Sequence, residues 1–314
     1  MPEAPANAGV SPSPAGAPKA WLPYAVLGAA VLIVSSAAIL IRIAQSEGVQ
    51  SLTIAAWRLT IAAALLGPLA WAKASTEITA LRQRDWLLGI AAGIFLALHF
   101  AAWISSLAYT SVASSTALVS TNPIWIALVS WLFLREKLGG WLVFGIAEAI
   151  TGSALIFLSD ASLVAGVGSS HPMLGNFLAV VGSLTVCGYL LIGRHLRKTM
   201  SLLPYIWLVY SSAAVALMST AIATGSTLSG FSTVAWGCLL ALAIGPQLLG
   251  HSAFNWALKH VSATFIAIVI LGEPLGSALL AWLIFDEHFA PLQLLGFSML
   301  LVGIYLASRA EKSG

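Results

Sequence analysis

The chain has 314 residues, of which 59% are hydrophobic and 8% are charged, and its net charge is +3. Soluble domains carry about 25% charged residues, so this composition excludes a water-soluble globule, and the small net charge does not indicate a nucleic-acid partner. Several apolar runs reach the roughly 20 residues that cross a hydrocarbon core of about 30 Å. The sequence therefore predicts an all-α integral membrane protein in contact with a lipid bilayer.

In chain order, residues 1–20 are rich in Pro, Ala, Gly and Ser and are predicted to be a disordered tail. The next apolar run is longer than the core of a signal peptide and is predicted to be a retained first span. Cys187 and Cys238 lie inside apolar runs, where unpaired core residues are favoured over a disulfide. Ten membrane-spanning helices are predicted, at 21–43, 52–72, 86–107, 111–134, 139–158, 173–193, 203–224, 233–257, 262–285 and 290–308.

The positions of the basic residues support this count. With both termini cytoplasmic, twelve of the fourteen Lys and Arg fall on the cytoplasmic side of the predicted spans. Arg42 alone falls on the opposite side, and Arg58 lies within the second span. This division follows the positive-inside rule. We expect a multi-pass protein of a bacterial-type inner (plasma) membrane.

One sequence pattern occurs twice, at an offset of 151 residues. LAYTSVASSTALVSTNPIWIALVSWLFLREK begins at Leu107, and LKHVSATFIAIVILGEPLGSALLAWLIFDEH begins at Leu258. Paired identities include Pro123 with Pro274, Trp131 with Trp282, Glu136 with Glu287, Gly145 with Gly296 and Gly152 with Gly303. This regularity predicts an internal repeat. The predicted division is a first repeat at 21–158, a linker at 159–172, a second repeat at 173–308 and a C-terminal tail at 309–314.

Each repeat holds five predicted spans, an odd number, so the second repeat enters the membrane from the opposite face. Inverted repeats of this kind are typical of secondary transporters, which alternate access by moving one unit against the other. The two quoted segments resemble the signature segments of EamA-type carriers of the drug/metabolite transporter superfamily, and are most similar to YddG-type amino-acid exporters. The resemblance covers the chain after residue 20. It implies a central cavity between two five-helix halves and export of small metabolites.

Three polar residues in the eighth span recur at i, i+4 and i+8 and share one face of a helix: Gln247, His251 and Asn255. Gly245–Pro246 precedes them and is expected to kink the helix and open space beside this face. We interpret the stripe as part of the cavity lining. A hydrogen-bond seam between helices is the alternative.

Further candidates lie in the third, fourth and sixth spans. His99 and Trp103 are four residues apart, and His99 and His251 are candidates for a pair of inward-facing histidines. A neutral His with satisfied hydrogen bonds is the alternative. Trp103, Trp125 and Tyr189 are candidate aromatic walls for an apolar or cationic group. Lipid-facing tryptophan is the alternative for each Trp.

Two X–Pro pairs lie about halfway along the fourth and ninth spans, Asn122–Pro123 and Glu273–Pro274. Proline removes a backbone hydrogen bond and frees carbonyl groups, so Pro123, Pro274 and Pro246 are candidate hinges. Glu273 stands where the first repeat has Asn122. It is interpreted as a counter-ion for an ammonium group, a proton carrier or a neutral hydrogen-bonded acid.

Other charged residues are read as structural. Glu136 and Glu287 end the fourth and ninth spans, and each is expected to pair with a chain neighbour, His288 in the case of Glu287. Arg58 is interpreted as a residue that extends its charge toward the interface, and a pair with Glu148 is the other possibility considered.

The sequence thus favours a secondary transporter whose small-molecule substrate, an amino acid or analogue, binds between the repeats. The predicted substrate-binding residues are His99, Trp103, Asn122, Trp125, Tyr189, Gln247, His251, Asn255 and Glu273. No catalytic group, metal or cofactor is predicted, and the chain is expected to act as a monomer or homodimer. An intramembrane enzyme and a channel are the alternatives. The first lacks an evident nucleophile–base arrangement, and the second lacks a charged pore ring.

Overall fold

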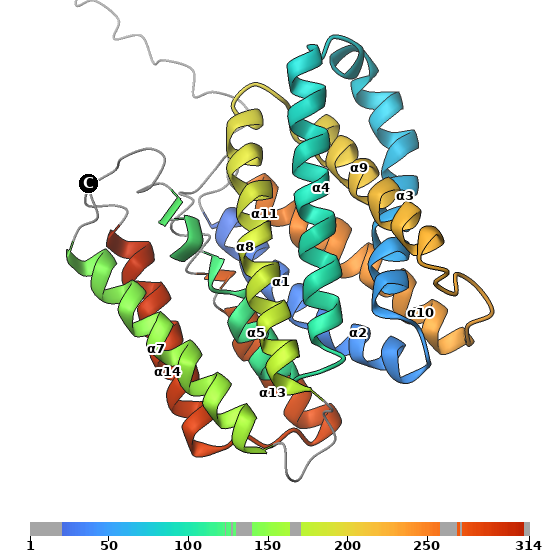
Figure 1. Ribbon diagram of the computed structural model, residues 1–314. Coiled ribbons are helices and arrows are strands. Elements are labelled where there is room, and N and C mark those ends of the chain that lie inside the picture. Colours follow the sequence, from blue (N-terminus) through green and yellow to red (C-terminus); the bar gives the residue numbers. More distant parts are fainter. Residues whose placement is uncertain are drawn as a thin grey trace, which may run out of the picture.

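The computed structural model describes residues 21–122, 124–126, 128–129, 140–163, 171–257, 269–270 and 272–310. These residues form helices and their connections (Figure 1). Six helical stretches are long and apolar enough to cross a membrane: Leu22–Ser46, Ser51–Thr79, Gln83–Ser106, Pro172–Leu196, Leu202–Ala223 and Thr233–Ala257. Shorter apolar helices accompany them. The all-helical membrane architecture is therefore confirmed, while the count of ten spans and the cytoplasmic termini stay predictions.

The first half of the chain begins with a span that is broken into two helices at Ser36, followed by longer helices. Its elements are α1 (Leu22–Ser35), α2 (Ala37–Ser46), α3 (Ser51–Thr79), α4 (Gln83–Ser106), α5 (Val112–Val119) and α7 (Gly140–Leu163). Gly48 adopts a φ of +83° in the turn between α2 and α3, a conformation that costs little only without a Cβ atom. The Ser111 hydroxyl accepts a hydrogen bond from the Ser114 amide at 3.0 Å and so caps α5.

The second half begins with two long helices and is interrupted in its third helical stretch instead of its first. Its elements are α8 (Pro172–Leu196), α9 (Leu202–Ala223), α10 (Thr233–Leu242), η1 (Ala243–His251), α11 (Ser252–Ala257), α13 (Gly272–Phe285) and α14 (Pro291–Ala310). The α10, η1 and α11 elements form one continuous helical stretch, whose middle part, η1, is a π-helix. All ten predicted ranges contain helix among the described residues.

Helices that the repeat relates to one another pack side by side. The pairs α3 with α9, α5 with α13 and α7 with α14 are all in contact, and α7 and α14 form an outlying pair in Figure 1. Between α7 and α14, a Cβ atom added at Gly152 would lie 2.6 Å from the Gly296 carbonyl oxygen, and one added at Gly303 would lie 2.5 Å from the Gly145 carbonyl oxygen. The backbones therefore approach each other directly, which small residues at a helix contact allow.

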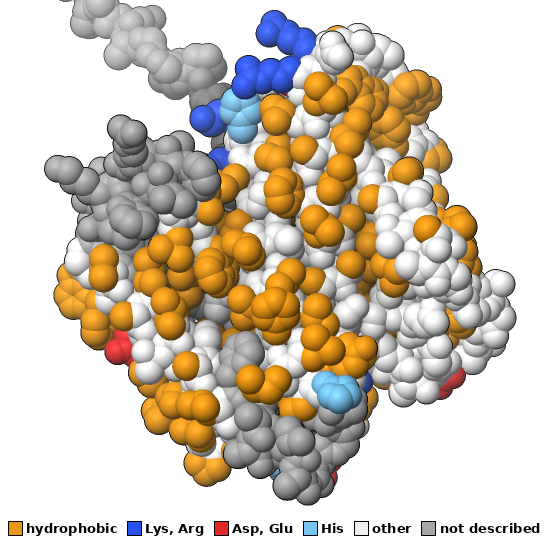
Figure 2. Space-filling view, viewed as in Figure 1, with side chains coloured by type: hydrophobic (Ala, Val, Ile, Leu, Met, Phe, Trp, Pro, Cys, Tyr) orange, Lys and Arg blue, Asp and Glu red, His pale blue; other side chains and the backbone are white. Residues whose placement is uncertain are grey.

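The main hydrophobic core lies where α4 packs against both α8 and α9. Large hydrophobic side chains such as Leu98, Phe177 and Leu184 are exposed on the outer faces of the helices. In the view of Figure 2, hydrophobic side chains cover the length of the helices, and Lys and Arg gather at the end that holds the α8–α9 connection. That end is the predicted cytoplasmic one. Cys187 and Cys238 are both free, which confirms that they do not form a disulfide.

Candidate functional site

The most strongly buried charge among the described residues is Arg58 on α3, whose side chain has no exposed surface. Its Nε donates a hydrogen bond to Oε1 of Gln247 on η1 at 2.9 Å. Its guanidinium carbon lies 4.1 Å from the ring centroid of Phe100 on α4, which is cation–π geometry. Gln247 is also fully buried. We call these residues, with His99 and His251, the central cluster.

The two predicted histidines both contact the Phe100 ring. The His99 ring centroid is 4.8 Å from that of Phe100, and the His251 centroid is 5.8 Å from it. Nδ1 of His99 donates to the carbonyl oxygen of Gly182 on α8 at 2.9 Å, since a carbonyl can only accept. His99 is therefore held between α4 and α8, with Nε2 as its second polar atom.

The aromatic side chains beside this cluster form two groups. Trp103 is buried and stacks on His99, with ring centroids 6.0 Å apart. The Tyr189 hydroxyl on α8 accepts from Nδ2 of Asn255 at 3.1 Å, and its ring stacks on Tyr205 at 6.5 Å. Trp103 therefore belongs to the aromatic group around Phe100, whereas Tyr189 links α8 to α9 and α11.

The predicted stripe of Gln247, His251 and Asn255 points to three different helices. Gln247 contacts α3 through Arg58, His251 contacts α4 through Phe100, and Asn255 contacts α8 through Tyr189. Residues Ala243–His251, which were expected to form an α-helix with a kink, form a π-helix instead of an α-helix. Proline lacks the amide that an α-helix needs, and the wider π turns incorporate Pro246 without a break.

Trp125 lies apart from the other two predicted aromatic residues. Its Nε1 donates to Oγ1 of Thr121 at 3.1 Å, and among the described residues no ring contact joins it to Trp103 or Tyr189. It lines a pocket of about 180 Å³ that also includes Thr121, Ile124, Leu128, Ile150, Ser153 and Val180. Thr121 is linked to Ser183 on α8 by a hydroxyl contact of 2.8 Å. The predicted aromatic residues therefore do not form one wall: Trp125 lines this pocket, and Trp103 and Tyr189 lie elsewhere.

The candidate hinges are placed only in part. The carbonyl oxygen of Glu273 accepts from Oγ of Ser35 on α1 at 3.4 Å, and the Glu273 carboxyl interacts electrostatically with Arg58. Pro274 is buried and is the third residue of α13. The carbonyl of Asn122 accepts a weak contact from Sγ of Cys187 at 3.5 Å. Pro123 lies outside the described residues, and the hinge roles stay predictions.

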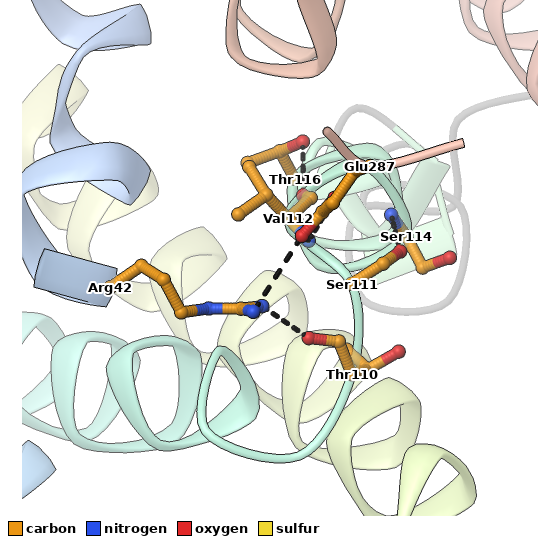
Figure 3. A network of polar contacts seen from close by, with 7 residues as sticks. All are labelled: Arg42, Thr110, Ser111, Val112, Ser114, Thr116 and Glu287. Carbon is orange, nitrogen blue, oxygen red and sulfur yellow. Dashed lines mark hydrogen bonds and ion pairs between the residues drawn. The ribbon is translucent and has the colours of Figure 1, made fainter. Parts of the chain in front are cut away.

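A second polar network joins α2, α5 and the end of α13 (Figure 3). Nη2 of Arg42 donates to the carbonyl oxygen of Thr110 at 2.6 Å, and Nη1 lies 3.6 Å from Oε1 of Glu287. Both carboxylate oxygens of Glu287 accept from the Val112 amide, at 3.1 and 3.2 Å. The carboxylate thus adds a second cap to α5, whose N-terminus favours negative charge. We call this set the Arg42 network.

Two predictions about charged residues are wrong. His288 does not pair with Glu287; its Nε2 lies 3.5 Å from Oδ1 of Asp286. Arg58 neither reaches the interface nor approaches Glu148, which is on α7 and away from α3. Glu136 lies outside the described residues.

Sequence reasoning passed over Phe100 and gave Arg58 no functional role. The sequence did contain a signal for Arg58, because a charged side chain inside a membrane span carries a large free-energy cost and is usually paired with another group. The repeat offset also pairs Phe100 with His251, which places these two residues at equivalent points of α4 and η1. Their ring contact shows that the two equivalent helices meet there.

Comparison with known proteins gives a consistent picture. A Clostridium kluyveri protein described as an uncharacterized transporter is 23% identical over 65% of this chain and 66% of its own length. The pseudopaline exporter CntI of Pseudomonas aeruginosa is 26% identical over 70% of this chain and 74% of its own. An uncharacterized transporter of Archaeoglobus fulgidus is 24% identical over 92% of this chain and 98% of its own.

A solved structure, titled only as the crystal structure of a protein, shares the fold. It superposes with a TM-score of 0.61 at 18% identity and covers 93% of this chain and 98% of its own. The sequence model of the EamA-like transporter family matches twice, at residues 21–158 and 173–309. The three relatives are named as transporters, and none of the three names specifies an amino-acid substrate. This chain belongs to the EamA-like transporter family.

Proposed function

We propose that this protein exports amino acids, including aromatic ones, by alternating access between its two halves. The observation that carries the proposal is the central cluster, in which α3, α4 and η1 bring buried polar groups onto an aromatic ring. Polar side chains inside membrane spans are costly and mark substrate paths. Because the chain belongs to a transporter family, solute binding is the function that best explains this costly cluster.

The chemistry of the cluster matches the parts of an aromatic amino acid. Arg58 supplies a cation and Glu273 an acid near it, which suit the carboxylate and the ammonium group of a zwitterion. Phe100, Trp103 and Tyr189 supply apolar and aromatic surface for the side chain. Trp103 has an indole nitrogen that is buried without a hydrogen-bond partner among the described residues.

Alternating access is supported by how the repeat-related helices meet. α5 packs on α13, and α3 packs on α9, so a rocking motion of one half displaces both pairs together. The central cluster draws residues from both halves, because Arg58 and Phe100 belong to the first and Gln247 and His251 to the second. A motion between the halves therefore opens or closes the site itself, as in other inverted-repeat carriers.

The test is counterflow of labelled phenylalanine and threonine into proteoliposomes that contain the purified chain, with and without a pH gradient. We expect exchange without a gradient, and we expect competition by other unlabelled amino acids. Accumulation only with a gradient would keep the carrier and add obligatory proton coupling. Absence of flux of either amino acid would contradict the proposal.

Two variants connect this flux to the site. His251→Ala and Gln247→Ala should lower counterflow while membrane insertion stays intact, because each removes a contact between the halves. Arg84→Gln, on the exposed start of α4, is the matched control and should transport normally. Normal counterflow by both site variants would remove η1 from the binding site.

A second candidate is the export of another metabolite on the same fold. It is favoured by the similarity to CntI, which is named as a pseudopaline exporter. Because that alignment covers only part of each chain, the similarity indicates a family and does not carry a substrate across. Competition of phenylalanine counterflow by a panel of unlabelled metabolites distinguishes the two: a metabolite that competes more strongly than any amino acid would favour this second candidate.

A further inference from the structure

Arg58 is unusual because most of its hydrogen-bonding capacity is unused. The side chain has no exposed surface, and an isolated charge in an apolar interior is strongly disfavoured. Its Nε has one neutral partner, Gln247. Nη1 and Nη2 are both buried and have no hydrogen-bond partner among the described residues. A guanidinium group can donate five hydrogen bonds, so the residues that the structure describes satisfy only a small part of this capacity.

The contacts that Arg58 does make fix the direction from which a ligand can approach. The guanidinium carbon lies over the Phe100 ring, 4.1 Å from its centroid, so the ring blocks approach to the guanidinium group from that side. Gln247 occupies the Nε edge at 2.9 Å. What is left is the terminal edge, where Nη1 and Nη2 diverge in one plane. That edge matches the two oxygens of a carboxylate, which can accept two parallel hydrogen bonds, one from Nη1 and one from Nη2.

The charged and titratable groups around Arg58 come from four other helices. They are His99 on α4, Tyr210 on α9, His251 on η1 and Glu273 on α13. Glu273 compensates part of the charge at a distance, and no hydrogen bond joins it to either terminal nitrogen of Arg58. The fork is therefore stabilised electrostatically without being occupied, a combination that leaves it able to take a second anion.

We propose that the terminal edge of Arg58 binds the carboxylate of the transported solute, with Gln247 as the positioning residue that holds the guanidinium group in plane. This assignment rests on the proposed function, since it names the chemical group that the central cluster recognises. It makes a carboxylate the required feature of the substrate and leaves the rest of the molecule to the aromatic walls. Neutral metabolites and simple amines are then poor substrates.

The first test compares ligands that differ only at the carboxylate. The pairs are phenylalanine with phenylalaninamide, and 3-phenylpropionate with 3-phenylpropionamide. The measurement is the rise in thermal unfolding midpoint of the purified full chain as each ligand is titrated. We expect each acid to bind about tenfold or more tightly than its amide, the size typical of a charge-assisted bidentate contact. Equal binding of acid and amide in both pairs would overturn the assignment.

The second test changes the arginine. Arg58→Gln should remove the preference for acids, and Arg58→Lys should retain a reduced preference, because an ammonium keeps the charge but loses the fork. Arg84→Gln is the control and should behave like the parent protein. A full preference in Arg58→Gln would overturn the assignment. If Arg58→Gln does not fold, the acid–amide comparison in the parent protein and in Arg58→Lys still decides the matter.

The outcomes separate this inference from the proposed function. Binding of 3-phenylpropionate but not of phenylalanine would keep the carboxylate site and contradict the amino-acid proposal. Counterflow of phenylalanine with equal binding of its amide would keep the amino-acid proposal and contradict the carboxylate site. Phenylphosphonate serves as a further probe: binding at least as tight as that of the carboxylates would overturn the assignment in favour of a phosphoryl site.

Discussion

The protein contains two internal arginines that are used in opposite ways. Arg42, on α2, is partly exposed, and both of its terminal nitrogens have protein partners, a carbonyl oxygen and a carboxylate. Arg58, on α3, has no exposed surface, and both of its terminal nitrogens lack partners among the described residues. The more deeply buried charge is thus the less satisfied one, which reverses the order expected from stability alone.

The difference separates a structural ion pair from a binding group. Glu287 caps the N-terminus of α5, and its ion pair with Arg42 ties three segments together (Figure 3). Removing either Arg42 or Glu287 leaves the charge of the other without its ion-pair partner. Arg58 has no such duty, because Gln247 is its one hydrogen-bond partner in the described part of the chain. Five substitutions test this contrast.

The largest effect is expected for Arg58→Gln. Counterflow of carboxylate solutes should fall at least about tenfold, because the charge-assisted contact is lost. The unfolding midpoint should stay the same or rise, since a buried and largely unpaired charge is removed. Transport assays and thermal unfolding on the same preparation measure both. A large fall in the unfolding midpoint would make Arg58 a structural residue like Arg42.

Arg42→Gln should show the reverse pattern. Loss of the ion pair and of the bond to the Thr110 carbonyl should destabilise the protein by about 1–2 kcal/mol, with little change in the acid–amide preference. Glu287→Gln should have a similar effect. The double variant should cost less than the sum of the two, because both act through one contact. Strict additivity would show that the two residues stabilise the protein independently.

Glu273→Gln should strengthen the binding of 3-phenylpropionate by about threefold to tenfold. This ligand has no ammonium group, so the substitution removes only the negative charge that competes with it for Arg58. Titration by thermal shift measures the change. Weaker binding of 3-phenylpropionate would show that Glu273 supports the anion site. Asp85→Asn, at the start of α4, is the matched control.

The smallest effect is expected at the predicted cytoplasmic end, for Glu77→Gln. Oε1 of Glu77 accepts from the Ser201 amide at 2.7 Å and so completes the start of α9 from α3. This contact resembles that of Glu287 on α5, but it is exposed. We expect a loss of about 0.5 kcal/mol or less, because water screens and replaces such contacts. A loss as large as that of Glu287→Gln would show that exposure does not control the strength of these caps.

The sequence was sufficient to predict an all-helical membrane protein built from a repeated unit, because hydrophobic runs and the spacing of Pro, Trp and Gly are local features of the sequence. The glycine pairs indicate small helix faces, but the sequence did not predict that α7 and α14 would contact each other. The surroundings of the charged residues did not follow. His288 was chosen for Glu287 because it is adjacent in sequence, whereas the real partner, Arg42, lies in the other half of the chain.

The central cluster shows the same limit. Hydropathy places Arg58 inside a span but does not say which way the side chain points, so an outward orientation was inferred in place of a contact with Gln247. The stripe on the eighth span was found by α-helical spacing, yet its residues Ala243–His251 form a π-helix. Whether proline kinks a helix or is absorbed in wider turns depends on packing against α1 and α3, which sequence spacing does not report.

The direct backbone contact between α7 and α14 has a mechanical consequence. Side chains between two helices act as a compliant layer, because rotamers can change and let one helix slide past the other. At Gly152 and Gly303 that layer is missing, so we expect α7 and α14 to move together as one rigid unit. Since one of these helices comes from each half of the chain, their contact holds the two halves together along that edge. In the alternating-access motion proposed above, we expect the pivot to lie along this edge and the widest displacement to fall on the opposite side, among α3, α9 and η1.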